Sequence, residues 1–280
     1  MLQPRRWSPD AAENFDLIER AAARAGITGG AGDVAVLPEL VGASALASRY
    51  EILVAGLARS LGCWVVGGSH HDRSAQHGRN RGVIVSPTGT IEGEYAKVNP
   101  YGRERAEGIA PGDGATCFEI DGRRLLVAIC ADFFHSSVFA EHTPDLVAVP
   151  AFSVTRLVNP RPARTVWRHM AVARSYELGA YVAISDWARG ARQAEIESSS
   201  VAGLAQPFPS PRDSYFVSLG VRQIAAFDLD FATVDAVHED RRQLGFLTRP
   251  NAPRWRGQSR SWWQTASSMI PNGSSQKVAK

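Results

Sequence analysis

The sequence has little cysteine and no long apolar run, and each scarcity excludes a class of protein. Its 280 residues include only three cysteines, none in a C-x-x-C pair, so neither a disulfide framework nor a zinc ribbon is indicated. No apolar stretch approaches the roughly 18 residues of a membrane helix, and no signal-peptide pattern opens the chain. The net charge of +3 is too small by itself to indicate nucleic-acid binding. These features predict a globular, cytoplasmic protein.

Lysine is also scarce. It occurs at Lys97 and again only at Lys277 and Lys280, in a polar C-terminal tail, while arginine supplies the other basic side chains. A single lysine within the body of the chain indicates a place that needs a compact ammonium group rather than a planar guanidinium. The histidines of the polar segment 69–79 have no partners at metal-ligand spacing, so no metal site is predicted.

What the sequence does contain is an alternation of helical and strand patterns, interrupted by hairpins. This alternation predicts one mixed α/β domain over residues 1–248, followed by an Arg- and Trp-rich extension and polar tail over 249–280. We expect the first helix to begin at Ser8-Pro9, with Ser8 as its cap and Pro9 in its first turn, and to stop at Gly26. Further helices are expected over 43–61, 167–178 and 231–238, and strands over 33–37, 63–67, 82–86, 90–95, 116–120, 124–129, 146–150, 181–185 and 223–228.

Cys130 ends one of these strands. The run Leu125-Leu126-Val127-Ala128-Ile129 is apolar throughout, as in a buried strand, and is followed by Cys130-Ala131-Asp132. A free cysteine is often only a core residue, and this is our interpretation of Cys63. At a strand end, however, a thiol can serve as a nucleophile, and a helix beginning near Asp132 would favour its thiolate through the helix dipole.

Two other predicted strands end in charged residues, Glu39 and Lys97. Together with Cys130 they form a chemically complete set. Cys130 would attack a carbonyl or nitrile carbon, Glu39 would accept the thiol proton and later activate water, and Lys97 with the backbone N–H of Ala131 would hold the developing negative charge. No histidine ends a strand in a comparable way, so a Cys–His pair receives less support.

The segments around these residues resemble the carbon–nitrogen hydrolase (nitrilase) superfamily. The resemblance is carried by Leu37-Pro38-Glu39-Leu40, Tyr95-Ala96-Lys97 and Ile129-Cys130-Ala131-Asp132, in that order. It implies a four-layer α-β-β-α sandwich with a Glu-Lys-Cys triad, and it makes Glu104 similar to the family's auxiliary acid. The chain departs from the family pattern in its short first strand, Met1 to Pro4, and at Asp186, where an asparagine is common.

Within the superfamily, Cys-Ala-Asp is more similar to the amidase-like branch than to true nitrilases. The resemblance therefore implies hydrolysis of a small non-peptide amide or carbamoyl-amide through a Cys130 thioester, with no cofactor and with a homodimer or higher homo-oligomer as the assembly. Tyr101, Ala131 and Phe134 are expected near the substrate, although core packing explains the aromatic residues equally well. A working nucleophile also predicts a lowered pKa for Cys130 alone among the cysteines.

A competing hypothesis is an accessory, catalytically silent domain of a larger protein. The C-terminal stretch from Arg249 to Trp263 interleaves arginines with tryptophans, a pattern that can stack on single-stranded nucleic acid. Packing over the body of the protein or across a dimer is the more common role of such a stretch, so nucleic acid is not the expected partner.

Overall fold

The strands of the computed structural model form two main sheets. The structure describes residues 1–74, 77–155, 158–193, 195–208 and 214–247, so the predicted extension over 249–280 lies outside the described residues. The first sheet has the order β1-β2-β4-β3, with β5 also paired to β4. Its strands are β1 (Val34–Val36), β2 (Trp64–Val66), β3 (His70–Asp72), β4 (Arg79–Val85) and β5 (Ile91–Ala96).

The second sheet carries the predicted nucleophile strand. Its order is β14-β13-β10-β8-β7-β6, with β7, β8 and β10 parallel to one another. The strands are β6 (Thr116–Ile120), β7 (Arg123–Val127), β8 (Leu146–Pro150), β10 (Tyr181–Ser185), β13 (Gly203–Ala205) and β14 (Phe216–Ser218). A small third sheet joins β11 (Arg192–Gln193), β12 (Ile196–Ser198) and β9 (Val154–Thr155).

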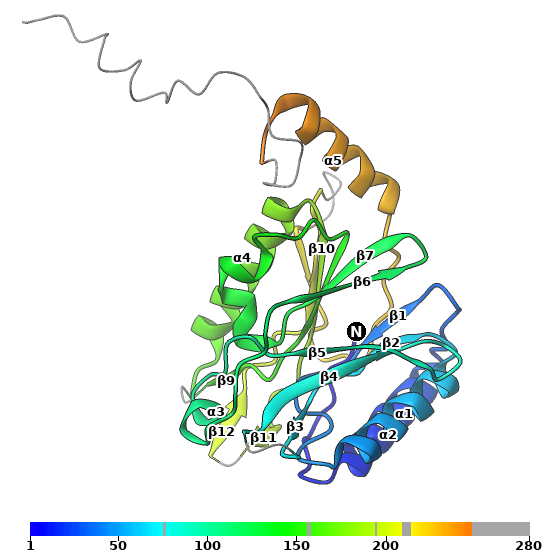
Figure 1. Ribbon diagram of the computed structural model, residues 1–280, viewed down its shortest axis with the longest axis vertical. Helices are drawn as coiled ribbons and strands as arrows, with labels where there is room; N and C mark the ends of the chain where they lie inside the picture. The colour runs from blue at the N-terminus through cyan, green and yellow to red at the C-terminus, as the bar shows by residue number, and fades with distance from the viewer. Residues whose placement is uncertain (75–76, 156–157, 194, 209–213, 248–280) are drawn as a thin grey trace, which may run out of the picture. The chain divides into compact units, whose positions relative to one another are not determined.

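Helices cover the outer faces of the two main sheets, which gives the expected four-layer α-β-β-α sandwich (Figure 1). α1 (Ala11–Ala25) and α2 (Ala47–Leu61) pack on the first sheet, and α4 (Arg161–Leu178) packs on the second. α3 (Arg103–Ala106) is a single turn in the loop after β5, and α5 (Phe231–Leu244) follows the last strand. In the described part of the chain, no helix has the length and apolarity needed to cross a membrane.

The packing of the run Leu125 to Ile129, which forms the second half of β7 and the two residues after it, explains why every residue of the run is apolar. Leu125, Val127 and Ile129 face the first sheet, while Leu126 and Ala128 face α4. Because side chains alternate along a strand, a strand buried on both faces must be apolar throughout. The run therefore ends between the layers, and the next residue, Cys130, is half-buried against the core clusters on both sides.

The ends of the helices show where local sequence rules held. Gly26 and Gly62 end α1 and α2 in the left-handed conformation, as predicted. The prediction that Ser8 caps the first helix was wrong. Asp10 is the cap, and its carboxylate accepts the N–H of Ala12 at 2.9 Å, whereas the Ser8 hydroxyl accepts the N–H of Asp10 itself, before the helix begins.

The chain ends of the domain differ from the expected pattern. Met1 to Pro4 runs irregularly between two other segments: the Leu2 N–H donates to Ser185 Oγ at 3.0 Å, and the Asp186 N–H donates to the Leu2 carbonyl at 3.2 Å. The expected strand over 223–228 is reduced to a bridge between Ile224 and Leu2. The two segments are nevertheless joined by backbone hydrogen bonds: the Gln3 N–H donates to the Gln223 carbonyl at 2.7 Å, the Ala225 N–H to the Met1 carbonyl at 3.1 Å and the Met1 ammonium to the Ala225 carbonyl at 3.0 Å.

Candidate active site

Glu39 lies in the loop after β1 and is buried. Its Oε1 accepts hydrogen bonds from Lys97 Nζ at 2.6 Å and from Asn80 Nδ2 at 2.9 Å, and its Oε2 accepts the N–H of Phe152 at 3.0 Å. Burial raises the pKa of Glu39, and the positive charge of Lys97 only partly opposes this. Glu39 is therefore a more basic carboxylate than an exposed glutamate, which suits a proton acceptor.

Lys97 follows β5 and links two carboxylates. Its Nζ lies 2.6 Å from Glu39 Oε1 and 2.6 Å from Glu104 Oε2, and the side chain is almost completely buried. Burial lowers the pKa of Lys97, but the charges of Glu39, Cys130 and Glu104 outweigh this effect and hold the pKa above its usual value. The side chain is therefore a permanent, desolvated ammonium ion, as its rarity in the sequence suggested.

Glu104 comes from α3 and holds the other side of Lys97. Besides the lysine, its carboxylate contacts His71 Nε2 at 3.2 Å and accepts hydrogen bonds from Asn80 Nδ2 at 2.6 Å and from the Tyr101 N–H at 3.0 Å. Burial raises the pKa of Glu104, but the bond to His71 and the charge of Lys97 reverse the shift and bring the pKa to about 2. Glu104 is thus ionised and fixed.

Cys130 begins a 3₁₀ helix, Cys130–Phe134, and has a left-handed backbone with φ of 48°. Its thiol lies 3.8 Å from the carbonyl oxygen of Phe152, to which it donates. The predicted lowering of its pKa was wrong. Burial and then the negative charge of Glu39 raise the pKa of Cys130 well above its usual value. A five-residue 3₁₀ helix has too small a dipole to offset them.

The backbone after Cys130 provides an unused donor and a rigid anchor. Within the described residues, the Ala131 N–H makes no hydrogen bond, so it is available to a ligand. The Asp132 carboxylate accepts the N–H groups of Val98 at 3.0 Å and Asn99 at 2.6 Å. The Asp132 carboxylate thus holds the loop that begins after Lys97 against the turn that begins at Cys130.

The residues predicted to contact substrate lie less centrally. The Tyr101 side chain is 66% exposed, and only its backbone N–H reaches the cluster, through Glu104. Phe134 packs edge-on against Trp167 with 4.8 Å between ring centroids, and Phe133 stacks on the same indole. Trp187 donates from Nε1 to the Glu39 carbonyl at 2.8 Å and so supports the glutamate loop. The substrate contacts of Tyr101, Ala131 and Phe134 stay predictions.

Two side chains of the cluster, Asn80 and His71, were not predicted from the sequence. They are neighbours across β3 and β4, and both point at Glu104. The polar sequence of segment 69–79 does not predict a strand, but β3 is buried there because His71 contacts Glu104 and His70 stacks on Tyr50 with 4.2 Å between ring centroids. An isolated Asn-Arg-Gly entering a strand gives no signal by itself. Among the described residues, no group of three or more His, Cys, Asp or Glu side chains is arranged to hold a metal.

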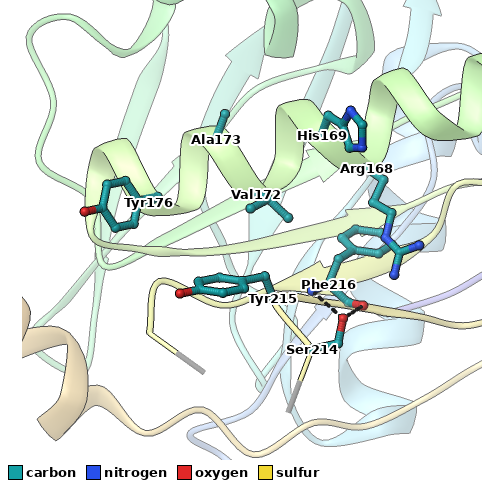
Figure 2. A pocket seen from close by; sticks show the side chains of 8 residues that line it. All are labelled: Arg168, His169, Val172, Ala173, Tyr176, Ser214, Tyr215 and Phe216. Carbon is teal, nitrogen blue, oxygen red and sulfur yellow. Dashed lines mark hydrogen bonds between the residues drawn. The ribbon is translucent and has the colours of Figure 1, made fainter. Parts of the chain in front are cut away.

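The site adjoins a small hollow, and a larger one lies elsewhere. The small hollow has a volume of about 110 Å³ and meets the cluster at Leu40 and His71; it is lined by Trp7, Pro9, Leu40, Ala43, Ser44, His71 and Gln193. The larger, of about 570 Å³, lies between α4 and the segment 214–216 (Figure 2). None of Glu39, Lys97, Glu104 and Cys130 lines the larger hollow, so it is separate from the chemistry proposed below.

The fold and the cluster define a class of hydrolase. A family model described as carbon-nitrogen hydrolase matches residues 1–202, a range that contains Glu39, Lys97, Glu104 and Cys130. The chain therefore belongs to the carbon-nitrogen hydrolase family. A search of curated proteins finds no significant match.

Solved structures with the same fold include two bacterial proteins. An amidase from Nesterenkonia sp. AN1 is 21% identical with a TM-score of 0.62, over 85% of this chain and 97% of that one. A CN-hydrolase superfamily protein from Xanthomonas campestris with an arsenic adduct in its active site is 18% identical with a TM-score of 0.68, over 88% and 94%. A mutant of the Nesterenkonia amidase, 22% identical with a TM-score of 0.61 over 74% and 84%, shows Michael addition of acrylamide at the active-site cysteine.

Proposed function

We propose that this protein hydrolyses a small non-peptide amide or carbamoyl-amide through a thioester on Cys130. One observation carries the proposal: a buried ammonium ion, Lys97, contacts both Glu39 and Glu104 at 2.6 Å, and its charge acts on the thiol of Cys130, in the turn after β7. A buried charged cluster of this kind is costly as a purely structural device. Its composition fits nucleophilic acyl transfer, which needs a nucleophile, a base and a cation for the developing oxyanion.

In the first half of the reaction, Cys130 Sγ attacks the amide carbon while Glu39 takes the thiol proton. Because the pKa values of both groups are raised, proton transfer accompanies attack rather than preceding it. The carbonyl oxygen becomes an oxyanion, which the Lys97 ammonium and the free Ala131 N–H stabilise. The tetrahedral intermediate then collapses. The C–N bond breaks, and Glu39 returns its proton to the departing amine or ammonia.

The second half releases the acid. Glu39, again ionised, removes a proton from water, and the resulting hydroxide attacks the thioester carbon. The same two donors hold the second oxyanion, the C–S bond breaks, and the sulfur recovers its proton from Glu39. Glu104 does not exchange protons in this scheme. Its low pKa keeps it ionised, and it fixes Lys97 through the 2.6 Å contact.

The test is ammonia release from a panel of short-chain amides and carbamoyl-amides, measured for the wild type, Cys130→Ala and Cys63→Ala. Cys63 is a buried core cysteine in the first sheet's helix-facing layer, so its variant controls for the loss of a thiol from the interior. We expect turnover of at least one amide by the wild type and Cys63→Ala, and none by Cys130→Ala. Turnover that survives in Cys130→Ala contradicts the thioester mechanism. If the wild type releases no ammonia from any amide of the panel, the accessory-domain hypothesis is favoured.

A further inference from the structure

Asp186 is a completely buried carboxylate behind the cluster, directly after β10. Its Oδ1 accepts the N–H of Ser153 at 3.0 Å. Its Oδ2 accepts the Val201 N–H at 2.8 Å and the Ser153 hydroxyl, and it lies 3.2 Å from the Ser198 hydroxyl, which donates to the Trp187 carbonyl at 2.6 Å. Each oxygen of Asp186 therefore accepts a backbone N–H, and none of the hydrogen-bond partners named here carries a positive charge.

Ser153 connects this carboxylate to the reacting groups through its neighbour, Phe152. The Phe152 N–H donates to Glu39 Oε2 at 3.0 Å, and the Phe152 carbonyl accepts the Cys130 thiol at 3.8 Å. One residue therefore contacts both the base and the nucleophile through its backbone. Asp186 grips the next residue along the chain by its N–H and its hydroxyl, which fixes the orientation of the peptide between them.

We propose that Asp186 is a positioning residue for acyl transfer: by clamping Ser153, it holds the Phe152 backbone where it aligns Glu39 with Cys130. This inference rests on the proposed function for its chemistry. It concerns orientation only, because Asp186 touches neither of the two reacting side chains.

In this chain the clamp fits a carboxylate rather than the asparagine amide that is common at this position, because each oxygen of Asp186 accepts a backbone N–H, from Ser153 and from Val201. In Asp186→Asn, one oxygen that accepts hydrogen bonds is replaced by an NH₂ group facing N–H and O–H donors. Two donors cannot satisfy each other, and a buried unpaired donor is costly, so the Ser153 segment has to move. A shift of this kind near reacting groups can lower a rate about 100-fold, because attack depends on the approach of sulfur to carbon. None of the Asp186 partners lines the hollow at Leu40 and His71, so Asp186→Asn leaves the lining of that hollow unchanged.

The experiment compares Asp186→Asn with Asp145→Asn. Asp145 is also buried after a turn of the second sheet and also accepts backbone and side-chain donors, but it pairs with Arg124, away from Glu39 and Cys130. With the best amide from the panel, we expect Asp186→Asn to lower kcat at least about tenfold with KM within about twofold. Asp145→Asn should keep kcat near the wild-type value. Equal kcat losses in the two variants, or an unchanged kcat in Asp186→Asn, overturn the proposal.

A second readout does not depend on amide turnover. Alkylation of Cys130 by iodoacetamide is followed against pH by peptide mass for the wild type, Glu39→Gln, Asp186→Asn and Asp145→Asn. Since the Glu39 charge raises the pKa of Cys130, Glu39→Gln should lower the alkylation midpoint, and loss of alignment in Asp186→Asn should lower it in the same direction. Asp145→Asn should leave it unchanged. An Asp186→Asn midpoint equal to the wild type overturns the inference even if amide hydrolysis is confirmed.

If Asp186→Asn does not fold, Ser153→Ala provides the same test with a smaller change. It removes the hydroxyl contact to Asp186 and leaves the Ser153 N–H contact in place. We expect an intermediate fall in kcat and an intermediate shift of the alkylation midpoint. Wild-type values for both in a folded Ser153→Ala protein contradict the clamp.

Discussion

Lys97 Nζ lies 2.6 Å from Glu39 Oε1, although the two residues are 58 positions apart in the chain. The contact joins the ends of β1 and β5, two strands that are not paired with each other in the first sheet. Burial nevertheless raises the pKa of Glu39 and makes it the more basic of the two carboxylates around the lysine, while the bond to His71 and the charge of Lys97 keep Glu104 ionised. The division of roles between two chemically identical side chains therefore follows from their surroundings.

Lys97→Arg should abolish most of the activity. A guanidinium is too wide to stand 2.6 Å from both Glu39 Oε1 and Glu104 Oε2, and its charge is spread over a planar fork. We expect kcat to fall about 100-fold or more, as for loss of an oxyanion donor, with the protein still folded by circular dichroism. Appreciable turnover by a folded Lys97→Arg protein would falsify the assigned role of Lys97.

Asn80→Asp should inactivate the enzyme without changing the size of the side chain. Asn80 Nδ2 donates to both Glu39 and Glu104, and a carboxylate in its place would bring a third negative charge and remove both hydrogen bonds. We expect kcat on the best amide to fall about 100-fold. Asn14→Asp is the control, because Asn14 is a buried asparagine of α1 that donates to Val41 and Ser8 carbonyls outside the cluster. A similar fall in both variants contradicts a specific role for Asn80.

Without substrate, Cys130 should alkylate slowly at neutral pH. Burial and the Glu39 charge raise its pKa, so the thiolate fraction at pH 7 is below that of a free thiol, whose pKa is about 8.5. The rate of reaction with iodoacetamide, measured at Cys130 by peptide mass, should still rise as the pH passes about 9. A plateau reached below pH 8.5 would show a preformed thiolate and contradict deprotonation by Glu39 during attack.

Acid should weaken the fold through Glu104. Its pKa is about 2 in the folded protein and 4.5 as its ordinary value, so its contribution to stability is present above pH 4.5 and is lost as the pH falls toward 2. The free energy of unfolding in urea should therefore fall more steeply below about pH 4.5 for the wild type than for Glu104→Gln. Glu119→Gln, at an exposed position of β6, should keep the wild-type slope. Parallel curves for wild type and Glu104→Gln contradict this coupling.

The sequence predicted the parts of the fold that depend on apolar periodicity. β8 and β10 match their predicted bounds, because long apolar runs leave few alternatives, whereas the strand predicted over 124–129 is β7, which ends two residues earlier, at Val127. β13 and β14 were missed, since each has three residues and its pairing is set by the neighbouring strand rather than by its own pattern. Very short strands depend on tertiary context.

The candidate site could be assembled from the sequence only at its strand ends. Glu39, Lys97 and Cys130 were found because each ends a recognisable run, and Glu104 was found through the family resemblance. His71 and Asn80 lie inside polar strand sequence, and their role exists only where β3 and β4 bring them against Glu104. The direction of the Cys130 pKa shift was missed for the same reason. It depends on burial and on the nearness of Glu39, which strand order alone does not reveal.

The left-handed backbone of Cys130 lowers the stability of the fold at the residue that carries the proposed nucleophile. A side chain at a φ of 48° costs about 1–2 kcal/mol compared with glycine. Glycine at this position would remove the conformational cost of the left-handed backbone, but it has no sulfur to act as a nucleophile. Alanine would keep the unfavourable conformation without the chemistry. The reactive sulfur is thus retained at a backbone position where the fold would prefer no side chain at all, and this part of the molecule is not optimised for stability.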